Sequence, residues 1–355
     1  MRWLCFGAGA IGTYIGGSLA LAGDEIVFLE QASALGTLRE RGLRLDLRAD
    51  NREHPSSTHL VAPESLALCG SLSEALDHGP FDAAIYALKS FDTEAAVDSM
   101  RPFAERMPPV VCFSNGVENE AAIADVLGEG RVVAATVTSA IGRRGLGDIV
   151  LERLRGIGIL SSHEISDQLV AAANAARLNA RPYANAAAMK WSKMLTNLIA
   201  NPTSAILNMT AAEVLHHPGI YRLEIQMLRE CLAVMRAQGI PVVDLPATPV
   251  RALALAVRLP VWASKPFLAR AAGSGRGDKM PSFHIDLYAG RGRSEVQYLH
   301  GAVARAARKA GIPTPVNSFL SETLMALTRG EIALTEYAQQ PQRLVEAARA
   351  GMRAP

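Results

Sequence analysis

The sequence predicts an α/β protein with two domains, a Rossmann-type dinucleotide-binding domain over residues 1–183 and an all-α domain over residues 184–355. A glycine-rich turn joins a strand to a helix within the first residues of the chain. Apolar strands then alternate with helices as far as Tyr183, and helical periodicity alone follows from Ala184. A chain of 355 residues, 49% of them apolar, is also too long for one ordinary core.

The first element is a strand over Arg2–Phe6, which runs into a GxGxxG turn and a helix that reaches about Ala22. A second strand is expected at Glu25–Glu30. In this setting the glycines permit a tight turn, close approach of a pyrophosphate and close helix packing, while the helix N-terminus supplies free N–H groups. We therefore expect a dinucleotide to bind at the following positions: Gly7, Gly9, Ala10, Ile11 and Gly12.

An acidic residue ends the second strand. Glu30 follows Gly12 by 18 residues, where a carboxylate can accept hydrogen bonds from the adenosine ribose and disfavours a 2′-phosphate. Glu30 and its neighbour Gln31 therefore favour NAD over NADP. Two alternatives stay open: Glu30 is simply an exposed residue at a strand end, or Arg39 or Arg41 on the next helix binds a phosphate.

Two further buried strands are expected at Ala83–Leu88 and Pro109–Phe113. Lys89 and Asn115 follow their carboxyl ends, where ligands bind in open α/β sheets, so both are candidate cofactor contacts. Each could instead serve as an ordinary cap or turn residue. Three antiparallel strands that extend the sheet, then a helix and a last strand, complete the domain; their expected ranges are 132–141, 148–154, 156–160, 166–176 and 178–183, with a glycine-rich turn at 142–147.

The second domain is expected to be helical. Candidate helices cover residues 185–201, 203–207, 210–214, 218–238, 247–257, 296–311, 316–329 and 340–351, and the segment 259–279 is interpreted as a short helix followed by a loop. The first helix carries Lys193, Asn197 and Asn201 at spacings of four residues, which places them on one face among apolar neighbours. Because an unpaired buried lysine is costly, this stripe faces a partner, a ligand or solvent.

A second candidate segment is MPSFHIDL, which leads into Ser294 and Glu295 at the start of a helix. An acid in that position interacts favourably with the helix N-terminus, so simple capping and an active-site role are both open. Arg291 and Arg293 in the preceding loop are more typical of a solvated turn than of a substrate clamp.

Composition excludes several classes of function. The 36 basic and 34 acidic residues give a net charge of +2, which provides no basis for binding nucleic acid or an anionic membrane. The four cysteines form no CxxC pair, and no Cys/His group has zinc spacing, so no metal is expected. The N-terminus has no leader pattern and no apolar run is long enough to span a bilayer, so we expect a soluble, cytoplasmic protein.

Taken together, six stretches resemble the ketopantoate reductase (2-dehydropantoate 2-reductase) family, in the family's order. They are GAGAIG at 7–12, LKS at 88–90, SNG at 114–116, KMLTNLIANPTSA at 193–205, MPSFHIDLYAGR…SEV at 280–296 and GIPTPVN at 311–317. The resemblance implies an active site between a Rossmann domain and a helical domain, an NADP cofactor, a small 2-keto acid substrate and a homodimer.

Residue by residue, the resemblance implies that Lys193 is the catalytic lysine and Glu295 the active-site glutamate. Asn197, Asn201 and Ser282 match substrate-side positions, and Lys89 and Asn115 match positions at the nicotinamide end. The expected reaction is NAD(P)H-dependent reduction of 2-dehydropantoate to pantoate. Protonated Lys193 would act as general acid, stabilising the negative charge that develops on the carbonyl oxygen and delivering the proton.

The sequence also departs from the family pattern. Gln31 stands where an arginine usually meets the NADP 2′-phosphate, Ala211 replaces an asparagine, and MPSF replaces the commoner SSM, with Lys279 near a usual asparagine. An insertion of about one residue falls at Gly290–Arg293. These changes leave three alternatives: a reductase for a different 2-keto acid, a non-catalytic NAD(P)-binding sensor or regulator, and a dehydrogenase of the 3-hydroxy-acid or opine type.

Overall fold

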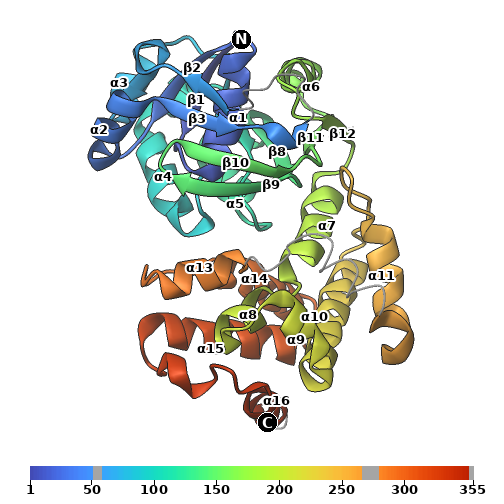
Figure 1. Ribbon diagram of the computed structural model, residues 1–355. Coiled ribbons are helices and arrows are strands. Elements are labelled where there is room, and N and C mark those ends of the chain that lie inside the picture. Colours follow the sequence, from blue (N-terminus) through green and yellow to red (C-terminus); the bar gives the residue numbers. More distant parts are fainter. Residues whose placement is uncertain (51–57, 266–279, 352–355) are drawn as a thin grey trace. The chain divides into compact units, whose positions relative to one another are not determined.

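A computed structural model describes residues 1–50, 58–265 and 280–351, which form two compact units (Figure 1). Unit 1 comprises Met1–Lys190 together with Leu245–Thr248, and unit 2 comprises Trp191–Asp244 and the residues from Pro249 onward. Unit 1 is α/β and the described part of unit 2 is helical, which confirms the predicted fold class. Among the described residues, none of the helices is both long and apolar enough to cross a membrane.

Unit 1 is built on an eight-stranded sheet with the order β12-β11-β8-β7-β6-β1-β2-β5. Neighbouring strands are parallel except for the pair β8 and β11. At the centre, Cys5 of β1 lies opposite Phe28 of β2 on one side and Ile85 of β6 on the other. The strands span Arg2–Phe6 (β1), Glu25–Leu29 (β2), Ala67–Cys69 (β5), Ala83–Tyr86 (β6), Val110–Cys112 (β7), Val132–Val137 (β8), Ile157–Leu160 (β11) and Ala180–Tyr183 (β12).

Two hydrophobic cores cover the two faces of this sheet. Alternate residues of β1 enter different cores: Trp3 and Cys5 join one, Leu4 and Phe6 the other. Such two-sided burial explains why the parallel strands are continuous apolar runs. Helices α1 (Ala10–Leu21), α2 (Ala32–Arg41) and α6 (Ser166–Ala175) contribute to the first core, and α3 (Leu72–Leu76), α4 (Thr93–Met100) and α5 (Asn119–Leu127) to the second.

A second sheet, of four strands, corrects the prediction for residues 140–153. Strands β9 (Ala140–Gly145) and β10 (Asp148–Arg153) do not extend the main sheet but pair in the order β4-β3-β10-β9 with β3 (Leu43–Asp46) and β4 (Thr58–Val61). Where the chain leaves the main sheet after β8, the N–H groups of Thr138 and Ser139 both donate to the carbonyl of Gly156. Buried residues of β10 join the α1 core, so this sheet covers α1.

Most helices of unit 2 lie close to the predicted ranges, whereas α13 (Ser282–Tyr288), which begins within the MPSFHIDL segment, was not predicted as a helix. The others are α8 (Asn201–Leu207), α9 (Ala211–His216), α10 (Pro218–Ala237), α11 (Val250–Arg258), α14 (Val296–Lys309), α15 (Pro315–Arg329) and α16 (Pro341–Gly351). Residues 261–265 are also helical. The rest of the predicted short helix, and the loop predicted after it up to residue 279, lie outside the described residues.

The helix predicted over 185–201 is shorter than expected. Helix α7 (Ala186–Leu198) begins in unit 1 and continues into unit 2, and Ala200 then adopts a left-handed conformation with φ +51° before α8 starts at Asn201. Pro202 cannot donate a backbone hydrogen bond, which prevents one continuous helix. The buried Glu224 carboxylate of α10 stabilises the break, accepting hydrogen bonds from Ala200 N (2.8 Å) and from Thr203 Oγ1 (2.6 Å).

The second sheet contains an ion pair that should make unit 1 sensitive to acid. The Asp46 side chain is 1% exposed and meets Arg48 at 2.5 Å and Arg144 at 2.9 Å. Hydrogen bonding from Arg48, supported by Arg144, lowers the pKa of Asp46 to about 2 in spite of its burial. Because the folded pKa lies below the ordinary value, the stabilisation is present above about pH 4 and is lost as pH falls towards 2.

We expect Asp46→Asn to lower the free energy of unfolding at pH 6 by on the order of 1 kcal/mol and to flatten its pH dependence between pH 4 and 2. Urea titrations across this range measure both effects. Asp77→Asn is the matched control, since Asp77 pairs with Arg106 at 2.8 Å but is 70% exposed and should matter little. Parallel losses of stability in wild type and Asp46→Asn would contradict the assignment.

Candidate functional site

The glycine-rich turn has the geometry that a dinucleotide site requires. Gly7 has φ +89°, a conformation that favours glycine, and a Cβ on Gly12 would lie 1.9 Å from the Gly7 carbonyl oxygen. A Cβ on Gly9 would instead meet nothing within 4 Å, so this position faces open space. No side chain caps α1 and no acid occupies its first turn, where Ala10 and Ile11 lie. The turn therefore offers backbone N–H groups to an anion.

Glu30 is bound to this turn rather than being a free residue at the strand end. One carboxylate oxygen accepts a hydrogen bond from Ala8 N and the other accepts one from Gln31 N at 3.1 Å. The Ala8 carbonyl in turn accepts hydrogen bonds from Thr13 Oγ1 (2.8 Å) and from Gly147 N (3.3 Å). The N–H and the carbonyl of Ala8 are thus both held by hydrogen bonds, and Glu30 lies at the end of β2, where the sequence predicts a contact with a cofactor ribose.

The arginines considered as phosphate ligands lie at the other end of their helix. Gln31 is the exposed N-cap residue of α2, whereas Arg39 and Arg41 occupy its last turn. Eight residues of α-helix separate Gln31 from Arg39 by about 12 Å along the axis. In unit 1, the residue at the end of β2 is the acidic Glu30, while these two arginines belong to the opposite end of α2.

Loops that follow β6 and β7 are joined at the carboxyl edge of the sheet. Ser114 Oγ donates to Leu88 O, and Ser90 Oγ donates to Asn115 O, both at 2.7 Å. Asn119 Nδ2 also donates to Asn115 O at 2.7 Å. Lys89 and Asn115, which were predicted from separate motifs, are thus brought onto one hydrogen-bonded edge in unit 1.

Sequence reasoning missed a charged pair behind this edge. Lys190 of α7 is 5% exposed and lies 2.6 Å from the Glu120 carboxylate of α5. Its ammonium also donates to Ser114 O at 2.6 Å. The sequence did contain a signal for this pair. Lys190 stands between two large apolar residues, Met189 and Trp191, about one helical turn before Lys193.

In unit 2, the stripe predicted on one helix is divided between two. Lys193 and Asn197 lie on α7, both half-buried, whereas Asn201 opens α8. Asn201 is 4% exposed; its Nδ2 donates to Asn197 O and its Oδ1 accepts from Phe283 N, both at 3.2 Å. The Asn201 amide therefore connects the end of α7 with the start of α13.

Ser282 is the first residue of α13 and its side chain is exposed. The hydrogen bond from the next residue, Phe283, to Asn201 fixes this helix start beside α8. At the other end of the segment, Arg291 pairs with the buried Asp286 at 2.8 Å, so this arginine has a structural partner. The Asn201 side chain thus bonds to the main chain of Asn197 and to that of Phe283, the residue after Ser282.

Glu295 is the N-cap residue of α14 and is 2% exposed. Its carboxylate makes no cap hydrogen bond with that helix, while Ser294 Oγ accepts one from Val296 N at 3.3 Å. Ordinary capping therefore does not account for the acid. A buried carboxylate that does not cap its own helix is a candidate for holding a cation or a proton.

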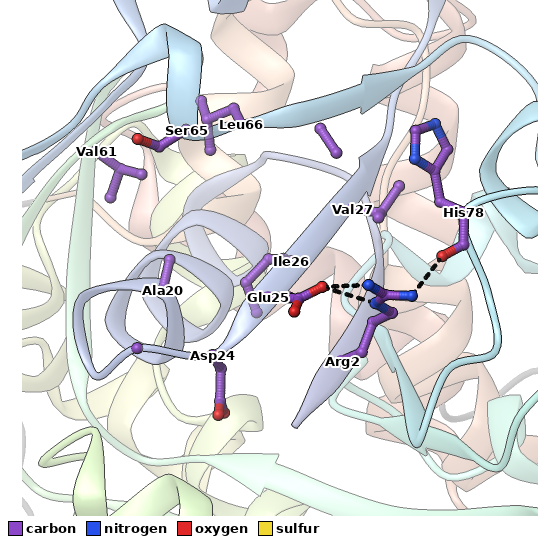
Figure 2. A pocket seen from close by; sticks show the side chains of 12 residues that line it. Arg2, Ala20, Asp24, Glu25, Ile26, Val27, Val61, Ser65, Leu66 and His78 are labelled. Carbon is purple, nitrogen blue, oxygen red and sulfur yellow. Dashed lines mark hydrogen bonds and ion pairs between the residues drawn. The ribbon is translucent and has the colours of Figure 1, made fainter.

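Unit 1 contains a hollow of about 380 Å³ that none of the candidate site residues lines (Figure 2). It is bordered by Arg2 and Glu25 at the amino ends of β1 and β2, whereas ligands of open α/β sheets bind at the carboxyl ends. Figure 2 shows the Arg2 guanidinium between the Glu25 carboxylate, at 2.6 Å, and the His78 carbonyl, at 3.1 Å. Arg2 and Glu25 are paired with each other and Asp24 is paired with the N-terminal amine, so this hollow is not the candidate cofactor site.

The described residues thus provide two sets of functional groups. Unit 1 offers uncapped helix N–H groups, an acid fixed at the end of β2 and a polar edge at the carboxyl ends of β6 and β7, which fit a dinucleotide. Unit 2 offers a lysine, two carboxamides, a hydroxyl and a buried acid, which fit a polar, oxygen-rich substrate. No group of three His, Cys, Asp or Glu side chains that could hold a metal ion occurs within residues 1–50, 58–265 and 280–351.

Comparison with known proteins agrees with this division. The family description "Ketopantoate reductase PanE/ApbA" matches residues 3–161, and "Ketopantoate reductase PanE/ApbA C terminal" matches residues 185–328. A 2-dehydropantoate 2-reductase of Halobacterium salinarum is 25% identical over 93% of this chain and 99% of its own length.

Solved structures share the fold. A PanE/ApbA family ketopantoate reductase from Ralstonia eutropha has a TM-score of 0.77 and 26% identity, covering 93% of this chain and 99% of its own. A D-mandelate dehydrogenase solved with NADH and anilino(oxo)acetate has a TM-score of 0.73 at 18% identity, with the same coverage. At that identity the second likeness concerns the fold alone.

Two glycine substitutions should separate cofactor binding from stability. Gly9→Ala adds a methyl group to open space in an allowed conformation, so stability should hold while NAD(P)H affinity falls at least about tenfold through obstruction of the pyrophosphate. Gly12→Ala forces a backbone clash and should cost about 1–3 kcal/mol of unfolding free energy. Fluorescence titration and thermal melting measure the two effects, and unchanged cofactor affinity in Gly9→Ala would exclude this turn as the phosphate site.

Proposed function

The chain belongs to the ketopantoate reductase family, and we propose that it reduces 2-dehydropantoate to pantoate with a nicotinamide dinucleotide as cofactor. The observation that carries the proposal is that one chain contains two features. Unit 1 has a glycine-rich turn of the kind that binds a dinucleotide at Gly7–Gly12, and unit 2 has a half-buried Lys193 and a buried Glu295. Both family descriptions match, one over each of these regions.

When bound, the cofactor supplies the hydride that reaches the keto carbon. The chain's residues would manage the charge and position of the substrate. Lys193 would donate a hydrogen bond to the keto oxygen, stabilise the negative charge that develops there and deliver the proton. Glu295 would keep the lysine ammonium oriented and charged.

Substrate binding would rest on Asn197, Asn201 and Ser282. Asn197 and Ser282 are the more accessible of the three and would bind the hydroxyl or carboxylate of the keto acid. The Asn201 amide already makes two main-chain hydrogen bonds, which supports a contribution through the placement of Asn197 and of the α13 start.

Cofactor binding would use the backbone of Gly7, Gly9, Ala10, Ile11 and Gly12 for the pyrophosphate, with Glu30 and Gln31 at the adenosine end. Lys89 and Asn115 would contact the nicotinamide end. The Glu30 carboxylate beside Ala8 supports a preference for NAD, since a 2′-phosphate would meet a negative charge there.

The direct test measures initial rates of NADH and NADPH oxidation by the purified protein with 2-dehydropantoate, followed by a panel of other 2-keto acids. We expect turnover with 2-dehydropantoate, and Lys193→Ala to lower kcat by about 10²–10⁴-fold with little change in cofactor Kd. Lys309→Ala, at the exposed end of α14, is the control for loss of a lysine.

Each other outcome has a distinct meaning. Turnover only with another 2-keto acid would assign the chain to a different substrate. Cofactor binding without oxidation across the panel would favour a sensor. A Lys193→Ala variant that keeps most of its rate would remove Lys193 from the mechanism.

The NAD preference is tested with two variants at one position. Glu30→Gln retains an oxygen that can accept from Ala8 N but removes the charge, so the ratio of NADPH to NADH affinity should rise about tenfold. Glu30→Ala also loses the hydrogen bond that fixes the turn and should weaken both cofactors. An unchanged affinity ratio in Glu30→Gln, measured by fluorescence titration, would show that the carboxylate does not select the cofactor.

A further inference from the structure

The most unusual charged group in unit 1 is Lys190. Of the lysines within the described ranges, it is the one classed as buried, with 5% of its surface exposed. Its ammonium lies 2.6 Å from Glu120 Oε1 and donates to two main-chain carbonyls, Ser114 O at 2.6 Å and Ala135 O at 3.3 Å. One cation thus joins α7, α5, the end of β7 and the strand β8.

The ammonium remains charged in this environment. Burial by itself lowers the pKa of Lys190, but the Glu120 carboxylate, aided by Cys112, more than offsets this and raises it. The Lys190 ammonium restrains the positions of its ionic partner and its two carbonyl acceptors. Moving any one of these groups away would leave a buried polar group without a hydrogen bond.

The carbonyl that Lys190 holds is in the cofactor-edge loop. Ser114 immediately precedes Asn115, and Lys190 holds the carbonyl of the peptide that joins them. The next carbonyl, Asn115 O, is fixed by Ser90 and Asn119. The Asn115 main chain is therefore held on both sides of its Cα. Lys190 holds the carbonyl on the N-terminal side, and Ser90 and Asn119 hold the carbonyl on the C-terminal side.

We propose that Lys190, oriented by Glu120, is a positioning residue that sets the Asn115 loop for the nicotinamide end of the cofactor. This role rests on the proposed contact between Asn115 and the cofactor. Lys190 itself does not touch the substrate or the reacting atoms; it acts through the Ser114 carbonyl. Because Lys190 is three residues before Lys193 on the same helix, it also fixes the start of the helix that carries the proposed acid.

The competing explanation is that the pair only stabilises the fold. A double-mutant cycle separates the two roles. The double substitution Lys190→Met/Glu120→Gln removes the charged pair and leaves no unpaired buried charge. This double substitution is made both in the wild-type protein and in the Asn115→Ala variant. Cofactor Kd is measured by fluorescence titration for NADH and NADPH, and thermal melting monitors folding.

A positioning role predicts that the replacement raises cofactor Kd about tenfold in wild type but less than about twofold in the Asn115→Ala background. Equal increases in both backgrounds, or no increase in wild type, would overturn the proposal. If the double replacement does not fold, Lys190→Gln/Glu120→Gln is carried through the same cycle, since it replaces the charged pair with two neutral amides and removes the ammonium that reaches Ser114 O. The same two outcomes then decide.

The readout is independent of the substrate. Cofactor binding with no turnover of 2-dehydropantoate would defeat the proposed reaction and leave the role of Lys190 to be decided by the cycle. A wild-type protein that bound neither cofactor would overturn both. Kd values and melting temperatures together therefore distinguish failure of the reaction, of the positioning role and of folding.

Discussion

Helix α1 must pack closely against its surroundings on two sides, and the rest of unit 1 depends on that constraint. A Cβ on Gly12 would meet the Gly7 carbonyl, one on Gly16 would lie 2.8 Å from the Phe28 ring of β2, and one on Gly17 would lie 2.8 Å from Leu45 of β3. The helix can therefore lie against both sheets only where it lacks side chains. The uncapped N-terminus of α1 follows the glycine-rich turn, so the same glycines allow close packing and leave backbone N–H groups uncapped.

Polar groups at the edges of the two units are fixed mainly through main-chain atoms. Glu30 holds Ala8 N, Lys190 holds Ser114 O, Glu224 holds Ala200 N and Asn201 holds Phe283 N. In each case a side chain distant in sequence satisfies a backbone group that no regular helix or sheet would satisfy. Loops built this way can present functional groups with little freedom, which favours binding by a preorganised site.

Local patterns were sufficient for much of the fold and for part of the site. Periodicity predicted the central strands and most helices because each buries a regular face, and the glycine spacing predicted the turn because steric limits admit few alternatives. The second sheet was missed because β3 and β4 are short and β10 pairs with β3, about a hundred residues earlier in the chain. The break at Ala200 and the Lys190–Glu120 pair depend on partners brought together only by tertiary folding, and one sequence does not display such partners.

Unit 1 is not continuous in sequence. Residues Leu245–Thr248 belong to it: Pro246 accepts a hydrogen bond from Thr138 Oγ1 at 3.0 Å and packs where a Cβ on Gly156 would be 2.8 Å away. The bend at Thr138, where the chain leaves the main sheet, is therefore completed by Pro246, which lies 108 residues later in the sequence. During synthesis on the ribosome, this part of the Rossmann-like unit cannot acquire its final contacts until Thr248 has emerged, by which time Trp191–Asp244 of the helical unit has already been made.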